Sequence, residues 1–166
     1  MELQLIKSRL EIDMEKIRIF FFLIALGFLS QNVNGQDQIE WMKFEEAVEA
    51  NEFQKKMLFV DVYTDWCGWC KKMDKETFTD PKVIEYINSN FYAVKLNAED
   101  TKRTFNFMGK EYNEAQMAAA MRVRSYPNFV IIDSTLQNIT QMPGYREPVP
   151  FLETLTGVVA NAFPKK

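Results

Sequence analysis

The stretch MLFVDVYTDWCGWCKKM, residues 57–73, decides the fold. Its first part, 57–63, is mostly apolar and rich in β-forming residues, which is typical of a strand buried on both faces. Cys67 begins a helical stretch that runs to about Thr77. A buried strand that leads directly into a helix favours a βαβ arrangement, and both cysteines of the chain lie where the strand gives way to the helix.

The rest of the chain alternates between the same two kinds of element. Asp80 followed by Pro81 is typical of a helix start, with the aspartate as N-cap. The pattern of apolar residues predicts helices at 44–51, 67–77, from 81 onward, 114–121 and 151–162, and strands at 57–63, 91–96, 128–132 and 137–142. Residues 98–112 are polar, and we expect a loop with some helix there. This order of elements predicts an α/β sandwich.

Composition excludes several classes of function. The chain has 166 residues, 26% of them charged and 47% hydrophobic, which fits one soluble globular domain. Its net charge is −3 and it has no basic stripe, so we expect no nucleic-acid partner. The absence of histidine removes the usual general base and the commonest transition-metal ligand. Chemistry must therefore come from the two cysteines, or from carboxylates, lysines or tyrosines.

The N-terminal segment has the features of an export signal. Ile19–Leu29 (IFFFLIALGFL) is an uncharged apolar run, with Lys16 and Arg18 just before it and small or polar residues up to Gly35 after it. This order is typical of a cleaved secretory signal peptide. We therefore predict a signal peptide at residues 1–35 and an exported protein.

Two details of this segment stay open. Met14 gives a more usual start than Met1, in which case residues 1–13 are not translated. The alternative to cleavage is a membrane anchor, although the apolar run is shorter than the roughly 20 residues that span a bilayer. In the favoured interpretation, residues 36–166 form one mature domain.

The motif Trp66-Cys67-Gly68-Trp69-Cys70 indicates redox chemistry, because it follows a buried strand and opens a helix. The N–H groups and the dipole at a helix N-terminus stabilise an anion, and the thiolate is the reactive form of cysteine. The spacing places both sulfurs on one side of the first turn. We expect Cys67 to be the exposed attacking cysteine and Cys70 to be the buried one that resolves the mixed disulfide.

Two alternatives compete with a redox-active Cys67–Cys70 disulfide. The first is a structural bridge, although closing so short a loop restrains the unfolded chain little. The second is half of a zinc site, which needs two more ligands in a chain without histidine or a third cysteine. We expect no metal, and no cofactor motif is present.

Four segments resemble the thioredoxin superfamily. FVDVYTDWCGWCKKM (59–73) resembles its active-site strand and helix, AVKLNAED (93–100) its next strand, and MRVRSYPNFVIID (121–133) the region of its cis-proline, while Gly144 lies where the family has a glycine after its hairpin. The resemblance covers roughly Met42 to Ala162. It implies the thioredoxin fold, a central mixed β-sheet flanked by helices on both faces, and among exported bacterial relatives it implies a periplasmic or secreted protein.

The resemblance implies two catalytic residues besides Cys67 and Cys70. Asp61 lies where the family has a buried carboxylate that assists proton transfer at the resolving cysteine, and burial would raise the pKa of that carboxyl. Lys95 matches the lysine that neighbours this carboxylate and would favour its charged form. Surface or strand-end charge is the alternative for both residues.

The expected substrate-binding residues are Trp66, Gly68, Trp69, Tyr126 and Pro127. Pro127 matches the family's cis-proline, which leaves the backbone of the preceding residue free to pair with a substrate chain. The three aromatic residues would form a flat apolar rim around the attacking cysteine. Packing of Trp66 on the domain is the alternative for that residue.

These features predict a thiol–disulfide oxidoreductase that acts on protein disulfides. Trp69 between the cysteines carries no charge to stabilise a thiolate, which favours a reductase over an oxidant. A reductase outside the cytoplasm must be recharged, so we expect a membrane electron carrier as a partner. We see no dimerisation segment and expect a monomer.

Other functions stay open at this point. A thioredoxin-fold binding or chaperone-like module would use the aromatic rim to hold unfolded chains, with incidental cysteines. A disulfide-forming oxidant would use the same pair in the opposite direction, and a disulfide isomerase is a weaker idea.

Overall fold

The computed structural model describes residues 37–164. The signal peptide predicted at 1–35 and the alternative start at Met14 lie outside these residues and stay predictions. The elements are β1 (Trp41–Met42), α2 (Phe44–Phe53), β2 (Met57–Tyr63), α3 (Gly68–Glu76), α4 (Pro81–Asn90), β3 (Phe91–Asn97), β4 (Thr104–Phe107), β5 (Lys110–Asn113), α5 (Glu114–Ala120), β6 (Asn128–Ile132), β7 (Ile139–Pro143) and α6 (Pro148–Ala162).

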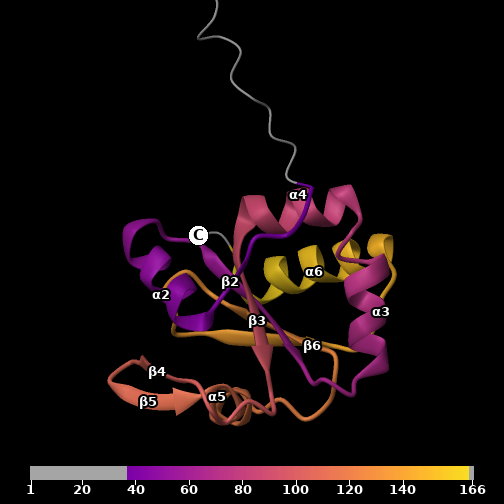
Figure 1. The fold of residues 1–166 in the computed structure, drawn as a ribbon. Helices are drawn as coiled ribbons and strands as arrows, with labels where there is room; N and C mark the ends of the chain where they lie inside the picture. Colours follow the sequence, from indigo (N-terminus) through magenta and orange to yellow (C-terminus); the bar gives the residue numbers. More distant parts are fainter. Residues whose placement is uncertain (1–36, 165–166) are drawn as a thin grey trace, which may run out of the picture. The chain divides into compact units, whose positions relative to one another are not determined.

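Five strands form one mixed sheet in the order β1-β3-β2-β6-β7 (Figure 1). The first three are parallel, β6 runs antiparallel to them, and β7 pairs antiparallel with β6 and so runs in the same direction as the first three. β2 lies at the centre, and its sequence is apolar throughout except for Asp61 because both of its faces are covered. The predicted α/β architecture is confirmed.

Helices cover both faces of the sheet (Figure 1). On one face, side chains of α4, α6 and α3 pack with Phe59, Phe129 and neighbouring strand residues into one core cluster. On the other face, α2 and α5 pack against Leu58, Val60 and Val94 in a second cluster. Successive residues of a strand point to opposite faces, which is why neighbours in β2 belong to different clusters.

Local chemistry fixes the start of α4, as predicted. The Asp80 side chain accepts hydrogen bonds from the N–H groups of Lys82 and Val83 at 2.9 and 3.2 Å, and Pro81 occupies the first turn. This cap fixes where α4 begins after the short link from α3, and α4 then leads directly into β3.

Residues 98–112 differ from the expected loop with some helix. The second half of this stretch forms a separate, two-stranded sheet of β4 and β5. Met108 and Gly109 have positive φ angles of 52° and 76°, as both residues of a type I′ hairpin turn require. Phe105 of β4 is buried, and its ring stacks on that of Phe44 with the centroids 5.3 Å apart. This contact holds the hairpin against α2.

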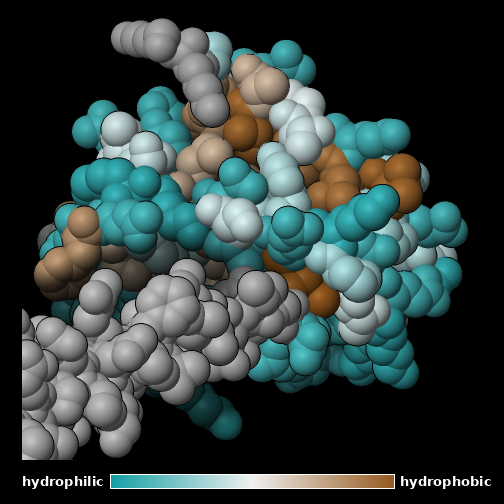
Figure 2. All heavy atoms as spheres, turned by 90° about the horizontal axis from the view of Figure 1, so that it is seen from above, coloured by the Kyte–Doolittle hydropathy of each residue, from teal (hydrophilic) through white to brown (hydrophobic). Residues whose placement is uncertain are grey.

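The surface is mostly hydrophilic, with hydrophobic residues in separate groups on the face that Figure 2 shows. Among the described residues, the large hydrophobic side chains that stand out most are Phe53, Trp66, Trp69, Met108, Ile139 and Val149. No helix between residues 37 and 164 has both the length and the apolar character that crossing a membrane requires.

Phe59 is the best place to test the core. It is fully buried, stacks on Phe129 at 5.5 Å and meets the edge of Phe151 at 5.9 Å. Phe59→Ala should lower the free energy of unfolding by about 3–5 kcal/mol in a denaturant titration, since it leaves a cavity at the centre of the sheet. Phe53→Ala is the matched control, because Phe53 is 93% exposed and its loss should change stability by no more than about 0.5 kcal/mol. Equal effects of the two variants would contradict this account of the core.

Candidate active site

A disulfide joins Cys67 and Cys70 at the N-terminus of α3, with the sulfurs 2.05 Å apart. Cys67 is the N-cap of the helix, and its Sγ accepts a hydrogen bond from the N–H of Cys70 at 3.1 Å. The N–H groups and the dipole of a helix N-terminus stabilise negative charge. This position therefore favours the thiolate form of Cys67 once the bridge is reduced.

The burial of Cys67 differs from the expectation that it would be exposed. Cys67 is 4% exposed and Cys70 3%. As the capping side chain, Cys67 turns back over the first turn of α3 instead of pointing outward. Trp66 and Trp69 stand out in its place, at 68% and 57% exposure.

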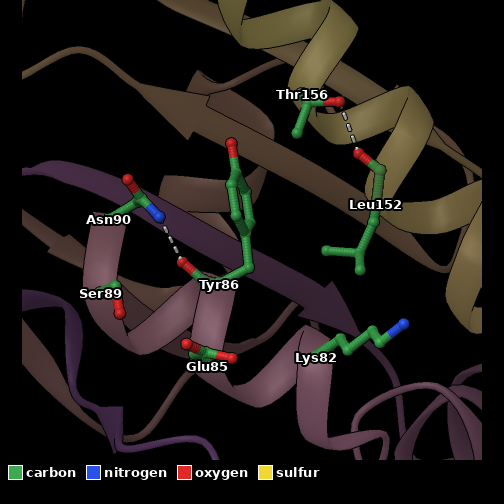
Figure 3. Close-up of a pocket in the computed structure, with 7 residues that line it drawn as sticks. All are labelled: Lys82, Glu85, Tyr86, Ser89, Asn90, Leu152 and Thr156. Atoms are coloured by element: carbon green, nitrogen blue, oxygen red, sulfur yellow. Dashed lines mark hydrogen bonds between the residues drawn. The ribbon is translucent and has the colours of Figure 1, made fainter.

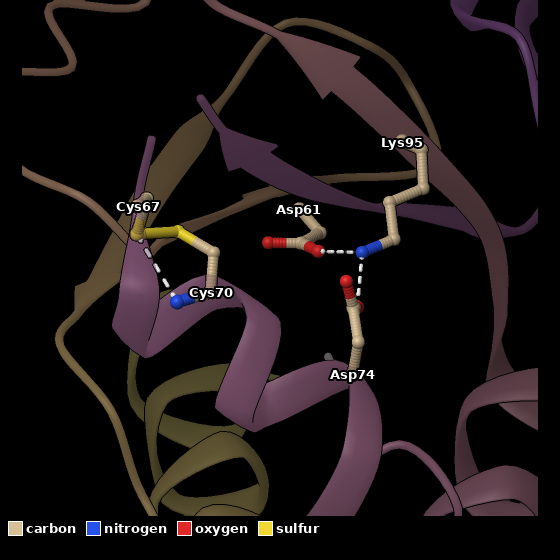
Figure 4. Close-up of a disulfide and its surroundings, with 5 residues drawn as sticks. All are labelled: Asp61, Cys67, Cys70, Asp74 and Lys95. Atoms are coloured by element: carbon tan, nitrogen blue, oxygen red, sulfur yellow. Dashed lines mark hydrogen bonds and ion pairs between the residues drawn. A yellow bond between two sulfur atoms is a disulfide. The ribbon is translucent and has the colours of Figure 1, made fainter. Parts of the chain in front are cut away.

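Asp61 lies in the central strand β2, where the register places it beside Lys95 of β3. Its side chain is 2% exposed, and its Oδ2 accepts a hydrogen bond from the Lys95 Nζ at 2.7 Å. Its Oδ1 is buried and has no hydrogen-bond partner among residues 37–164. In Figure 4 the carboxyl lies between the disulfide and Lys95, with this second oxygen directed toward the side of the disulfide.

Burial sets the acidity of Asp61. Desolvation raises its pKa, Lys95 partly opposes this rise, and the charge of Asp74 adds to it, so that the pKa moves from 3.8 to about 6. A carboxyl with such a pKa can both take up and release a proton near neutral pH.

Asp74 of α3 joins this group, and the sequence reasoning missed it. The Lys95 Nζ forms an ion pair with Asp74 as well as with Asp61, so one ammonium serves two carboxylates. Asp74 is 46% exposed and gives the group an edge toward solvent. Its position four residues after Cys70, on the same face of the helix, is the signal that could have identified it.

Aromatic rings enclose the Lys95 ammonium. The ring centroids of Trp41, Tyr63 and Phe78 lie 4.8, 5.2 and 5.4 Å from its Nζ. Desolvation lowers the pKa of Lys95, but the ion pairs with Asp61 and Asp74 outweigh it and hold that pKa above its usual value. Lys95 therefore stays charged beside Asp61.

A shallow groove lies beside the disulfide helix. The Tyr126–Pro127 peptide bond is cis, which confirms the expectation from the resemblance. The groove has a volume of about 230 Å³ and is lined by Trp69, Tyr126, Pro127, Gly144 and Tyr145. Gly144 has a φ of +94°, a conformation that side chains other than glycine rarely adopt.

The aromatic residues at the groove form two pairs. Trp66 meets Tyr126 edge to face at 5.9 Å, and its Nε1 donates a hydrogen bond to Glu99 at 2.9 Å. Trp69 packs against Tyr145 at 5.0 Å. Tyr145 was not among the predicted site residues, because it follows Gly144 in a segment without a recognisable motif.

Gly68 does not belong to the groove lining. It is exposed between the two cysteines, at the first position of α3, and its role in substrate binding stays a prediction.

A larger hollow of about 360 Å³ lies between α4 and α6 (Figure 3). Its lining shares no residue with the groove beside Trp69. The two hydrogen bonds drawn there, Asn90 to Tyr86 and Thr156 to Leu152, each stay within one helix. Within residues 37–164, three or more potential metal ligands do not gather anywhere.

Comparison with known proteins identifies the fold. Residues 44–158, more than half of the chain, match the model of the family described as the thioredoxin-like domain. The Thiol:disulfide interchange protein DsbD of Photorhabdus laumondii is 27% identical over 117 residues, which cover 69% of this chain and 18% of DsbD. The chain thus spans less than a quarter of the length of the DsbD relatives it matches.

Two solved structures extend the comparison. A candidate disulphide-isomerase from Bacteroides thetaiotaomicron is 29% identical, with a TM-score of 0.57 over 78% of this chain and 98% of that one. A thioredoxin from Thermus thermophilus is 19% identical, with a TM-score of 0.60 over 76% of this chain and 91% of that one, a likeness that concerns the fold alone. The expected thioredoxin fold is confirmed.

The shared lysine makes a testable link between Asp74 and Asp61. Because the pKa of Asp61 is raised on folding from 3.8 to about 6, its contribution to stability is present below pH 4 and falls by about 3 kcal/mol as pH rises through 6. Asp74→Asn removes a negative charge that raises the pKa of Asp61, and Lys95 then pairs with Asp61 alone. The loss of stability with rising pH should therefore be smaller and should end at lower pH. Denaturant titrations of the oxidised chain between pH 4 and 8 measure it.

Asp61→Asn is the control for this experiment. Because this variant lacks the titrating group, it should not show the loss of stability that Asp61 causes in the wild type. The difference in the free energy of unfolding between the two proteins should therefore change over the same pH range. A pH profile of Asp74→Asn that matches the wild type would show that Asp74 does not act on Asp61.

Proposed function

This chain belongs to the thioredoxin-like family of thiol–disulfide oxidoreductases, and we propose that it reduces disulfide bonds in other proteins through Cys67 and Cys70. One observation carries the proposal: Cys67 caps α3 with its sulfur while a buried carboxyl, Asp61, lies behind the pair. A structural bridge needs neither feature. Together they supply a stabilised thiolate and a proton carrier.

The first step is attack by the reduced enzyme. The Cys67 thiolate attacks one sulfur of a substrate disulfide, a mixed disulfide forms, and the other substrate sulfur leaves as a thiolate that takes a proton from water. The N-terminus of α3 stabilises the attacking thiolate through its N–H groups, as the hydrogen bond from the Cys70 N–H to the Cys67 sulfur indicates.

The second step releases the substrate. Cys70 must lose its proton before its sulfur attacks that of Cys67, and we assign Asp61 as the acceptor. Its Oδ1 has no hydrogen-bond partner in the described part of the chain, and a pKa of about 6 lets it accept and later release the proton. The second substrate sulfur leaves as a thiolate and takes a proton from water, so the substrate has gained two electrons and two protons as two thiols, and the enzyme is left oxidised as the Cys67–Cys70 disulfide.

Lys95 would act through Asp61 and not on the sulfurs. Its ammonium favours the ionised carboxylate, which is the form that accepts a proton, while burial favours the neutral form. The balance of the two effects keeps Asp61 usable in both directions of proton transfer.

The groove beside the disulfide is the proposed binding site for the substrate chain. Tyr126 makes no backbone hydrogen bond within residues 37–164, so its N–H and C=O are available to an extended substrate segment. Trp66 and Trp69 offer exposed apolar surface on either side of Cys67.

Two features support the reductive direction. Trp69 between the cysteines carries no charge, so it adds nothing to the stability of the Cys67 thiolate. The nearby Lys72 is paired with Glu76 at 3.6 Å, and its charge is balanced there. A thiolate that is less stabilised makes the dithiol a stronger reductant.

A reductase of this kind needs a dithiol donor that returns two electrons after each turnover. We propose a membrane carrier for this role, because the chain has no cofactor motif and the DsbD relatives are named as interchange proteins. The leader-like segment at 1–35 supports an exported, periplasmic site of action. The chain is proposed to act as a monomer.

Isomerisation of protein disulfides is a second candidate. The relative from Bacteroides thetaiotaomicron, 29% identical, is named as a candidate disulphide-isomerase. In an isomerase Cys67 attacks in the same way, but a thiol of the substrate then attacks the mixed disulfide and releases Cys67. The substrate therefore gains no electrons overall. Counting substrate thiols after reaction separates the two functions.

The two cysteines should give different products when substituted. The pre-reduced chain should reduce a model protein disulfide such as that of insulin, and Cys67→Ser should abolish this activity because the attacking sulfur is lost. Cys70→Ser should instead trap a mixed disulfide between Cys67 and the substrate, visible on a non-reducing gel and removed by dithiothreitol. A Cys67→Ser variant that still reduced insulin would refute Cys67 as the attacking sulfur, and one that lost this activity but kept full cellular function would favour a binding module.

A further inference from the structure

We propose that Tyr145 determines substrate specificity, forming with Trp69 one wall of a subsite that takes a large apolar side chain flanking the substrate cysteine. The inference rests on the proposed function and specifies the segment that the enzyme attacks. Neither residue reacts, so both would act by holding the substrate beside Cys67.

The size of the groove fits a single side chain. Its volume of about 230 Å³ is below the roughly 300–1,000 Å³ of sites for small molecules and cofactors. It begins at Trp69, which lies between the two cysteines, so a side chain bound there belongs to a residue near the reacting disulfide.

The wall joins Trp69 of α3 to Tyr145, which follows β7 and is held by contacts with α3. The rings lie 5.0 Å apart, and the Lys72 ammonium lies over both, 5.3 Å from Trp69 and 4.7 Å from Tyr145. The Tyr145 hydroxyl donates a hydrogen bond to Glu76 at 2.8 Å, and Glu76 is in turn paired with Lys72. These contacts fix the position of the Tyr145 ring.

The opposite side of the groove is also aromatic. Tyr126 lines it and is supported by Trp66, while Pro127 is buried and Gly144 contributes no side chain. A groove between two aromatic pairs favours an aromatic or large aliphatic occupant, which can stack on or pack against the rings.

Charge supports the same occupant. None of the five residues that line the groove is charged, and Lys72 and Glu76, which contact the Trp69–Tyr145 wall, balance each other. A charged side chain would lose water in the groove without gaining a partner, whereas an apolar one gains from leaving water.

The experiment compares two peptides that differ only beside the cysteine. Each carries one cysteine joined to glutathione by a disulfide, with phenylalanine on both sides of the cysteine in one peptide and serine in the other. The pre-reduced chain is mixed with each peptide, and the loss of protein thiols gives second-order rate constants for a single turnover. The wild type should react about tenfold faster with the phenylalanine peptide.

Tyr145→Ala should reduce this preference to about twofold or less, since half of the wall is lost. Its rate with hydroxyethyl disulfide, which has no flanking side chain, is measured alongside, and the peptide rates are divided by it so that a general loss of reactivity is not counted as a loss of preference. Tyr145→Phe keeps the ring and should keep the preference. Tyr112→Ala, which removes a half-buried tyrosine from β5, is the matched control and should behave as the wild type.

The outcomes separate the two proposals. A wild type that does not discriminate between the peptides, or a Tyr145→Ala variant that keeps the full preference, overturns the specificity role while hydroxyethyl disulfide is still reduced. A chain that reduces neither the peptides nor hydroxyethyl disulfide overturns the proposed function, and the specificity inference falls with it.

Discussion

The parallel pairing of β2 with β3 is the constraint on which the site depends. Its register places Asp61 beside Lys95 in the middle of the sheet, where a carboxylate would otherwise be too costly to bury. The same strand β2 ends just before the cysteine motif, so the disulfide at the start of α3 lies on the same side of the sheet as the carboxyl. A shift of the register by one residue would turn Asp61 to the opposite face and remove its partner.

The charges near the disulfide form a group with one cation and two carboxylates. Asp61 is buried, Asp74 reaches solvent, and Lys95 binds both within a shell of aromatic rings. Burial of a charged pair alone is weak evidence for stability. The pair matters here for its chemistry. Asp61 and Asp74 compete for one ammonium, and this helps to keep the pKa of the buried Asp61 carboxyl near the pH at which it can exchange protons.

The parts predicted from sequence are those with a local physical signal. The apolar run of β2, the Asp80 cap of α4 and the cysteine spacing each depend on a few adjacent residues. The hairpin of β4 and β5 was missed, because its burial depends on Phe105 meeting Phe44 from a distant part of the chain. Asp74 and Tyr145 were missed for the same reason: their roles arise from contacts with Lys95 and Trp69 that only folding creates.

The reduction potential of the Cys67–Cys70 pair tests the central claim most directly. The chain is equilibrated with dithiol redox buffers, and its reduced fraction is measured after the thiols are alkylated. The account predicts a potential near or below about −250 mV, because only the N-terminus of α3 stabilises the Cys67 thiolate and the potential of the reductant thioredoxin is about −270 mV. A value near about −120 mV would mark an oxidant that makes disulfides, and a bridge that resisted all dithiols would contradict a redox role altogether.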